Sequence, residues 1–243
     1  MTNKATNITV SFYELEWDTK FFGVSSAKAI LHEPLTMDNW GDLKARFKEY
    51  QFISIENRNS EPLNAQLIGR DTSAFLADVN IQFTKKLESQ EMVSHDIKIR
   101  QTLERNDELL RIADFRFSKF TEDLELLKRG GDQVYKQWLV NSFGQKDKHF
   151  AISKGSESRI NGFLLHSYKD DTCVIELIAV ASNEADSGIG TKLFKSVENS
   201  AFQRGFTEIR VGTQVRNRAA INFYHKVGCR QVECNQVYHL WNI

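Results

Sequence analysis

The sequence predicts an α/β protein with a mixed, mostly antiparallel central sheet flanked by helices. One supporting observation is the element order of the C-terminal part, which indicates three strands followed by helix, strand, helix and strand. Another is that Gly205 and Gly228 follow the two helices where a helix end favours a left-handed residue. The chain of 243 residues, 41% hydrophobic and 26% charged, also has the composition of a globular protein with a full core.

The N-terminal region is predicted to form a smaller α/β unit. Apolar side chains recur every three or four residues over 36–50, which indicates an amphipathic helix. Residues 52–55 are typical of a short strand, and Pro62 is expected in the first turn of a helix that reaches residue 68. Partial alternation over 74–83 predicts a further strand.

A polar stretch over 87–95 separates this region from the rest, so we expect an N-terminal substrate-side region, 1–92, and a C-terminal domain, 93–243. The C-terminal elements expected in chain order are strand 97–101, helix 106–113, a loop with a helical turn over 115–131, a helix capped by Asp132 that reaches residue 143, strands 149–153, 161–168 and 173–181, helix 188–204, strand 207–212, helix 218–226 and strand 230–239.

Charge and cysteine content exclude several classes of protein. Positive and negative side chains balance at 32 each, which argues against broad nucleic-acid binding. The three cysteines, Cys173, Cys229 and Cys234, are interpreted as reduced thiols, and no histidine pair has metal-ligand spacing. No secretory signal or membrane-length apolar stretch is apparent. We therefore expect a cytoplasmic protein with no metal, nucleic-acid or membrane partner.

A glycine-containing turn follows the apolar strand 174–180 and opens a helix. The unpaired amides of a first helical turn, together with the helix dipole, suit a phosphate. A dinucleotide fingerprint would need glycine where Leu193 lies, and a P-loop would need lysine before Thr191 rather than after it. Neither nucleotide motif fits, and a tight turn without a ligand remains the alternative.

A second motif, Asn217-x-x-Ala-x-x-x-Tyr224-x-x-x-Gly228, follows in the sequence. Together the two motifs resemble those of the GCN5-related N-acetyltransferase (GNAT) family, whose patterns are Gln/Arg-x-x-Gly-x-Gly/Ala and Asn-x-x-Ala-x-x-x-Tyr-x-x-x-Gly-Phe. Ala185 stands in place of the first Gln/Arg, and Cys229 in place of the last Phe. The resemblance covers about residues 97–243. It implies the GNAT fold and acetyl transfer from acetyl-CoA, as co-substrate, to an amine.

The resemblance also implies roles for particular residues. Tyr224 is implied to lie beside the coenzyme sulfur, and as a phenol with a pKa of about 10 it is matched to protonate a thiolate of pKa about 8.5. Glu176, an acidic residue in an apolar strand, is the candidate base, with a solvent-facing glutamate as the alternative. The expected cofactor-binding residues are Ile178, Ala179, Val180, Asp186, Ser187, Gly188, Ile189, Gly190, Thr191, Asn217 and Phe223.

Short segments spread over the chain resemble the enzymes that acetylate the 4-amino group of a dTDP-4-amino-4,6-dideoxyhexose. These segments are 14–23, 115–117, 135–138, 211–214 and 238–241. The resemblance implies a nucleotide-sugar acceptor used in polysaccharide biosynthesis, and a homodimer. The implied substrate-binding residues are Phe21, Phe22, Gln214, Tyr238 and His239. An aromatic mini-core is the other interpretation of Phe21 and Phe22.

Two alternatives to this function stay open. One is a GNAT enzyme that acetylates another amine, such as a protein N-terminus or a small molecule. The other is a non-catalytic regulator that binds acetyl-CoA. Residues 52–75 also resemble 209–232 in spacing, which fits either a degenerate half-GNAT in the N-terminal region or generic α/β spacing.

Overall fold

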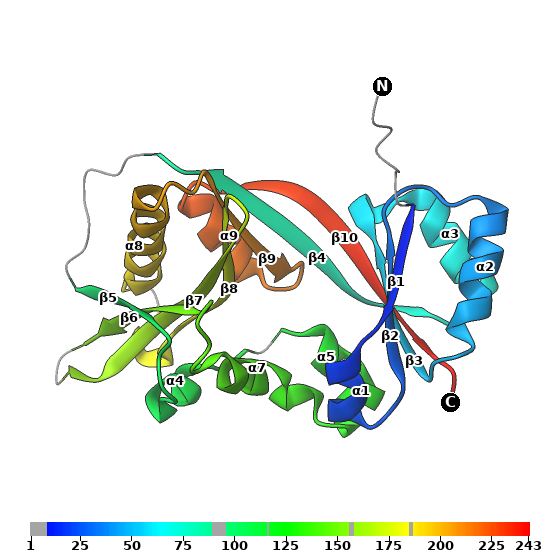
Figure 1. Ribbon diagram of the computed structural model, residues 1–243, viewed down its shortest axis with the longest axis horizontal. Coiled ribbons are helices and arrows are strands. Elements are labelled where there is room, and N and C mark those ends of the chain that lie inside the picture. Colours follow the sequence, from blue (N-terminus) through cyan, green and yellow to red (C-terminus); the bar gives the residue numbers. More distant parts are fainter. Residues whose placement is uncertain (1–8, 89–95, 116, 156–157, 185–186) are drawn as a thin grey trace. The chain divides into compact units, whose positions relative to one another are not determined.

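The computed structural model describes residues 9–88, 96–115, 117–155, 158–184 and 187–243. The chain forms two compact units, each discontinuous in sequence (Figure 1). The first unit comprises Met1–Ile81, Ser118–Asp132 and Glu233–Ile243, and the second comprises Gln82–Phe117 and Gln133–Val232. The boundary expected near residue 92 lies outside the described residues.

The first unit is a small sheet with helices. Its strands are β1 (Val10–Glu14), β2 (Ser26–Leu31), β3 (Phe52–Asn57) and most of β10 (Arg230–Trp241), in that order across the sheet. β2 is parallel to β3, whereas β1 and β10 are antiparallel to their neighbours β2 and β3. The helices are α1 (Glu16–Phe22), α2 (Met37–Phe47), α3 (Pro62–Asp71), α5 (Lys119–Glu122) and α6 (Leu124–Lys128), with a short turn at Arg58–Ser60.

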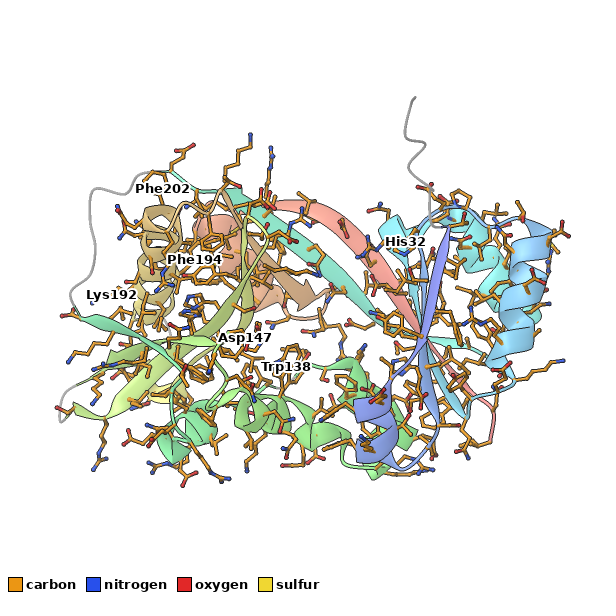
Figure 2. All side chains as sticks on the ribbon, viewed as in Figure 1. His32, Trp138, Asp147, Lys192, Phe194 and Phe202 are labelled. Carbon is orange, nitrogen blue, oxygen red and sulfur yellow. The ribbon has the colours of Figure 1, made fainter. Side chains whose placement is uncertain are left out.

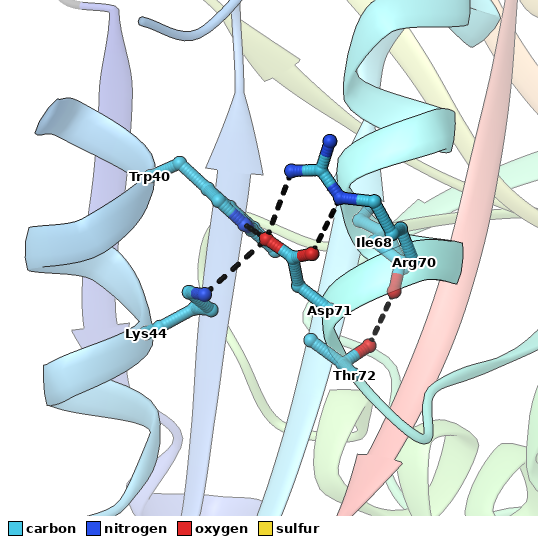
Figure 3. Close-up of polar contacts among 6 residues, drawn as sticks. All are labelled: Trp40, Lys44, Ile68, Arg70, Asp71 and Thr72. Atoms are coloured by element: carbon cyan, nitrogen blue, oxygen red, sulfur yellow. Dashed lines mark hydrogen bonds and ion pairs between the residues drawn. The ribbon is translucent and has the colours of Figure 1, made fainter. Parts of the chain in front are cut away.

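Helices α2 and α3 form as the sequence predicts, with Thr36 accepting the capping hydrogen bond from the amide of Asn39 and Pro62 as the first residue of α3. Asp71 joins the two helices by accepting hydrogen bonds from Trp40 Nε1 at 2.8 Å and Lys44 Nζ at 3.3 Å (Figure 3). Beneath them lies the core of the unit, made of Ala29, Leu31, Leu35, Trp40, Leu43, Phe47, Ile53, Ile55, Leu67, Ile68, Tyr238 and Leu240.

The second unit is a larger sheet in the strand order β4-β9-β8-β7-β6-β5, in which β8 and β9 are parallel while β7 is antiparallel to β6 and β8. Its elements are the second half of β4 (Phe75–Lys86), β5 (Ile97–Gln101), α4 (Asp107–Ile112), α7 (Val134–Ser142), β6 (His149–Lys154), β7 (Ile160–Lys169), β8 (Thr172–Val180), α8 (Ile189–Gln203), β9 (Glu208–Gln214) and α9 (Arg218–Lys226), with short turns at Gly131–Gln133 and Ser182–Glu184.

The mixed α/β architecture is therefore the one predicted. Gly205 and Gly228 have φ values of 86° and 88°, which confirms their left-handed positions. The expectation that Asp132 caps the helix after it was wrong. Gln133 occupies the N-cap of α7 and makes no side-chain capping bond there, because a short 3-10 turn over Gly131–Gln133 precedes the helix.

Helices cover both faces of the larger sheet. Leu109 of α4 and Leu139 of α7 pack with Phe150, Phe163 and Leu177 on one face. Helix α8 covers the other face, where a Cβ on Gly162 of β7 would meet the side chains of α8. In Figure 2, Phe194 marks the inner side of α8 and Lys192 its outer side, in agreement with the complete burial of Phe194.

Two stretches of the chain share an element order. β2-α2-β3-α3-β4 and β8-α8-β9-α9-β10 each run strand, helix, strand, helix, strand, and in each the first two strands are parallel neighbours. This agreement supports the half-repeat interpretation of the similar spacing in 52–75 and 209–232. Within the described residues, no helix is both long enough and apolar enough to cross a membrane.

Candidate active site

Strands β8 and β9 separate from each other part-way along their length. They pair only over Thr172–Ile175 and Glu208–Val211, although both strands continue further. At the same point the pairing of β7 with β8 changes register, since Leu165 opposes Leu177 and His166 opposes Ile175. Glu176 is therefore the extra residue of a β-bulge. A bulge bends its strand and increases the local twist, which accounts for the opening between β8 and β9.

A pocket of about 260 Å³ occupies this opening. Strand β8, strand β9, helix α9 and the segments on either side of 118–132 all contribute to it. The residues that line it are Asp114, Phe115, Phe117, Tyr135, Glu176, Leu177, Ile178, Gly212, Thr213, Gln214, Asn217, Ala220 and Tyr224. The splayed strands thus bring the two expected catalytic residues, Tyr224 and Glu176, to one cavity.

Helix α9 presents Tyr224 to this pocket. Asn217 is the N-cap of the helix and accepts a hydrogen bond from the amide of Ala220 at 3.1 Å. Asn217, Ala220 and Tyr224 follow the helical spacing and lie on one face. Tyr224 is only 3% exposed, and burial raises its pKa well above the ordinary value for tyrosine. Its hydroxyl is therefore protonated at neutral pH, but burial also makes it a weaker acid than the ordinary phenol that the sequence argument matched to a thiolate.

Glu176 is held by two donors. Lys148 Nζ lies 2.6 Å from Oε1, and Trp138 Nε1 donates to Oε2 at 3.2 Å. Burial lowers the pKa of Lys148, but the hydrogen bond to Glu176 and the charges of Glu176 and Asp147 together outweigh this effect, so the pKa is raised overall. The sequence had suggested a lone carboxyl group among apolar neighbours, whereas the structure has a paired carboxylate. Each carboxylate oxygen still has a second lone pair for a further donor.

A second pocket, of about 180 Å³, lies at the start of α8. It is lined by Val180, Glu184, Gly188, Ile189, Gly190, Thr191, Phe223 and Lys226. Gly188 is the N-cap of α8, and among the described residues no side chain makes a capping hydrogen bond there. The described part of the chain therefore leaves the amides of the first helical turn without a side-chain cap, as an anion site requires.

The two glycines of this turn have different roles. Gly188 has a φ of 81°, a left-handed conformation that favours glycine, while a Cβ there would meet nothing within 4 Å. A Cβ on Gly190 would lie 3.3 Å from the ring of Phe223. The sequence analysis expected both glycines to admit a phosphate to the backbone. In the structure, Gly188 is needed for its backbone conformation and Gly190 for the packing of α8 on α9.

The two pockets are linked by two elements. Ile178 lines the first and Val180 the second, two positions apart on β8. Tyr224 and Phe223 are adjacent on α9, and Tyr224 lines the first pocket while Phe223 lines the second. Ala179 lies between and pairs with Phe163 of β7. An extended ligand with an anionic end at α8 would therefore follow the free edge of β8 to Tyr224.

The remaining expected cofactor residues are less informative. Ser187 is exposed and precedes α8, where its hydroxyl donates to the carbonyl of Glu184 at 2.6 Å. Asp186 lies outside the described residues. Within the described part of the chain, no group of three or more His, Cys, Asp or Glu side chains is arranged to hold a metal ion.

Of the expected substrate-binding residues, Gln214 lines the first pocket and donates from Nε2 to the hydroxyl of Tyr135 at 3.1 Å. The other four belong to the first unit. There His239 is completely buried against Asp123, with 2.7 Å between Nδ1 and Oδ2, and Phe22 and Tyr238 are also buried. Phe21 stacks on Trp17 with ring centroids 4.6 Å apart. In this structure these four side chains pack within the first unit, and their assignment to the substrate stays a prediction.

Sequence reasoning missed part of the site. Lys148 was not considered, because its partner Glu176 is distant in the chain and no local pattern marks the pair. Tyr135 and Trp138 lie in a segment that resembles the sugar acetyltransferases, but the sequence assigned them no role. Their spacing, with Tyr135 and Trp138 one helical turn apart on α7, is the signal that would have grouped them.

Residues 109–229 match the model of the acetyltransferase (GNAT) family. This span includes both pockets, from the bulge of β8 to Tyr224. The chain contains a GNAT acetyltransferase domain. The domain is therefore that of an acetyl-CoA-dependent N-acetyltransferase, and its structure explains both sequence motifs. The first supplies the uncapped turn of α8, and the second supplies the N-cap and the tyrosine of α9.

Comparison with known proteins gives relatives of this GNAT domain. The chain is 26% identical over 230 residues to a dTDP-fucosamine acetyltransferase of Escherichia coli O6:H1, covering 91% of this chain and 94% of the relative. It is 22% identical over 127 residues to the spore coat polysaccharide biosynthesis protein SpsD of Bacillus subtilis, covering 52% of this chain and 44% of that protein. The chain thus matches less than half the length of SpsD.

Among solved structures, a conserved protein of unknown function from Staphylococcus epidermidis is similar with a TM-score of 0.68 and 16% identity. The similarity covers 99% of this chain and 94% of that protein. A GCN5-related N-acetyltransferase from Sphaerobacter thermophilus is similar with a TM-score of 0.63 and 12% identity, over 96% of this chain and 76% of that protein. These similarities extend the shared fold to both units of the chain.

Proposed function

We propose that the protein transfers the acetyl group of acetyl-CoA to the 4-amino group of a nucleotide-linked 4-amino-4,6-dideoxyhexose, with dTDP as the nucleotide. The observation that carries the proposal is the pair of pockets joined by β8 and α9, one suited to a diphosphate and the other to an acceptor. The relative named dTDP-fucosamine acetyltransferase, which is matched over 91% of this chain, supports the choice of acceptor.

Acetyl-CoA binds with its diphosphate at the amides of residues 188–191 and its pantetheine arm along residues 178–180. The edge of β8 that faces β9 has no ladder partner there, since pairing ends at Ile175 and Val211. A backbone amide on this edge is available to the thioester carbonyl, where it stabilises the oxyanion of the tetrahedral intermediate. Phe223 forms the wall between the diphosphate and the thioester.

The neutral amine attacks the thioester carbonyl, a C–N bond forms, and the C–S bond breaks. Tyr224 protonates the departing thiolate, and its burial keeps that proton in place until the thiolate forms. The proton lost by the amine passes through water to Glu176 and on to solvent, while Tyr224 regains its proton. Alignment of the two reactants contributes much of the acceleration.

Two further features belong to this proposal. We place the reaction in the cytoplasm, and we take the active protein to be a homodimer that needs no metal, nucleic acid or membrane. The mass of the protein in solution, measured by light scattering, tests the dimer directly. A monomeric mass at assay concentration would remove that part of the proposal without affecting the chemistry.

The test of the function is release of coenzyme thiol from acetyl-CoA with a panel of dTDP- and UDP-linked amino sugars, including both C4 epimers. We expect turnover with a dTDP-4-amino-4,6-dideoxyhexose and little with the UDP analogues. Peptides with free N-termini and simple amines serve as the competing acceptors. Turnover confined to those amines would contradict the sugar assignment while leaving the acetyltransferase intact.

The substitution Tyr224→Phe separates an enzyme from a coenzyme-binding regulator. It removes the hydroxyl and keeps the ring, so we expect kcat to fall about 100-fold or more while the Kd for acetyl-CoA is unchanged. Titration calorimetry measures the Kd. Equal kcat values for the two proteins would exclude Tyr224 as the acid, and a wild type without turnover on any amine would favour the regulator.

A further inference from the structure

We propose that the stacked side chains of Tyr135 and Trp138 form the platform on which the sugar ring of the acceptor lies, and that Trp138 also positions the Glu176 carboxylate for the amine. The proposal rests on the proposed function and adds a substrate-recognition element to it. It concerns residues of the second unit alone.

The platform is built on α7 beside the acceptor pocket. The rings of Tyr135 and Trp138 are stacked, with centroids 6.1 Å apart and an interplanar angle of 16°. Phe115 packs on Tyr135 at 5.3 Å, and both residues line the pocket. Trp138, labelled in Figure 2, is 41% exposed, whereas its neighbour Leu139 is completely buried. A large aromatic surface is thus left open next to a polar cavity.

The platform is hydrogen-bonded to both strands that border the opening. Gln214 at the end of β9 donates to the Tyr135 hydroxyl at 3.1 Å, and Trp138 donates to Glu176 at the bulge of β8 at 3.2 Å. The two rings are therefore fixed to both sides of the acceptor pocket. Such anchoring lowers the entropic cost of presenting an aromatic surface to a ligand.

A 4,6-dideoxyhexose has the chemistry that this surface recognises. Its 6-methyl group and axial C–H bonds form an apolar face suited to an aromatic ring, while its amine needs a charged or polar partner. A cavity of about 260 Å³ is smaller than the roughly 300–1,000 Å³ of sites for drug-sized ligands, so it has room for only part of the acceptor. Tyr135 lines this cavity and Trp138 lies beyond its lining, so the platform extends the acceptor site past the cavity.

Trp138 serves both the apolar face of the sugar and its amine. Its face offers the stacking surface, and its indole N–H holds Oε2 of Glu176, while Lys148 holds Oε1 at 2.6 Å. With both oxygens fixed, the remaining lone pairs of the carboxylate have defined directions toward an ammonium group or a relay water. Trp138 is therefore a positioning residue, and the two parts of its side chain have separable effects.

Two substitutions separate these effects. Trp138→Phe keeps an aromatic face and loses the N–H group, so we expect kcat to fall about ten-fold and its pH profile to shift, with the KM for the sugar nucleotide within about three-fold. Trp138→Ala loses both, so we expect the KM to rise about ten-fold as well. The control is Trp17→Phe, because Trp17 is also exposed and stacked but belongs to the first unit.

Steady-state kinetics with both substrates, thermal melts and the Kd for acetyl-CoA complete the experiment. Unchanged melts and coenzyme Kd values exclude a folding effect. If Trp138→Ala keeps the wild-type KM for the sugar nucleotide, or if the two Trp138 variants are identical in both parameters, the platform is refuted. If the wild type acetylates no amino sugar, the acceptor assignment itself fails and the platform with it, so the two failures are distinguishable.

Discussion

Two buried histidines of the second unit make stability depend on pH. His166 is completely buried, with its ring centroid 5.3 Å from that of His149. Burial, followed by the charges of His149 and Arg204, lowers the pKa of His166 to about 3. Since an exposed histidine has a pKa of about 6.5, the unfolded chain binds this proton first as the pH falls. The free energy of unfolding therefore decreases below pH 6.5, and this group has no effect above it.

We predict that His166→Gln loses less stability than the wild type between pH 7 and pH 4.5. At pH 4.5, the neutral buried His166 lowers the free energy of unfolding of the wild type by about 2–3 kcal/mol relative to pH 7, and the variant lacks this loss. Thermal melts at several pH values measure the slope, so any constant destabilisation by the substitution cancels. His225→Gln is the control, because His225 is exposed. A wild-type slope in the His166 variant would contradict the assignment.

At the same scale, the burial of individual side chains could not be predicted from the sequence. Tyr224 was assigned from its motif, and the structure places it on the pocket that opens between β8 and β9. Phe22 and His239 were assigned to the substrate from a resemblance, yet both are buried in the first unit. Aromatic residues follow the same sequence pattern in a hydrophobic core as in the wall of a binding site. Only their burial in the folded structure distinguishes the two.

At the scale of elements, the junction of α8 and α9 determines the shape of the pocket at the start of α8. Gly190 of α8 faces Phe223 of α9, and both line that pocket. Phe223 also makes an edge-to-face contact with Phe194, with centroids 6.2 Å apart. A Cβ on residue 190 would lie 3.3 Å from the Phe223 ring, so the position of that ring depends on the absence of a Cβ at Gly190.

We predict that Gly190→Ala raises the Kd for acetyl-CoA about ten-fold, because the new methyl group displaces the Phe223 ring into the pocket. The added substitution Phe223→Leu removes the ring atoms that the methyl group would meet, so the double variant is expected to recover most of the affinity. Titration calorimetry measures both. A double variant as weak as Gly190→Ala would show that the wall is not the cause.

Elements with strong local signals were predicted closely. Strand β5 and helix α9 have the bounds expected from the sequence, since a capping asparagine at 217 and the glycine at 228 mark the two ends of α9. The helix after residue 131 was predicted with the wrong cap because a 3-10 turn intervenes. The bulge at Glu176 had no local signature, since it is a relation between β7 and β8.

For the whole molecule, the decisive feature is that the compact units do not follow the chain. Strands β4 and β10 each contribute residues to both units, and the segment Ser118–Asp132 returns to the first. Tyr238 and Leu240 of β10 belong to the core of the first unit, and β10 pairs with β3 from Gln236↔Asn57 to Trp241↔Phe52. Residues near both chain ends therefore complete one core.

We predict that residues 1–92 do not fold alone, because the fragment leaves the edge of β3 unpaired and removes part of its core. Circular dichroism and limited proteolysis of the isolated fragment measure this. Co-expression with residues 93–243 supplies β10 and is expected to restore protection of the fragment. A cooperative unfolding transition for 1–92 by itself would contradict the prediction.

The sequence by itself determined the α/β class, most helices and strands and the two GNAT motifs, because those features depend on residues within one or two helical turns of each other. The tertiary structure alone decided the bulge that opens β8 from β9, the Trp138–Glu176–Lys148 contacts, and the discontinuous units. These depend on which strands become neighbours and which side chains lose contact with water, and residues far apart in the chain specify both only when the core forms.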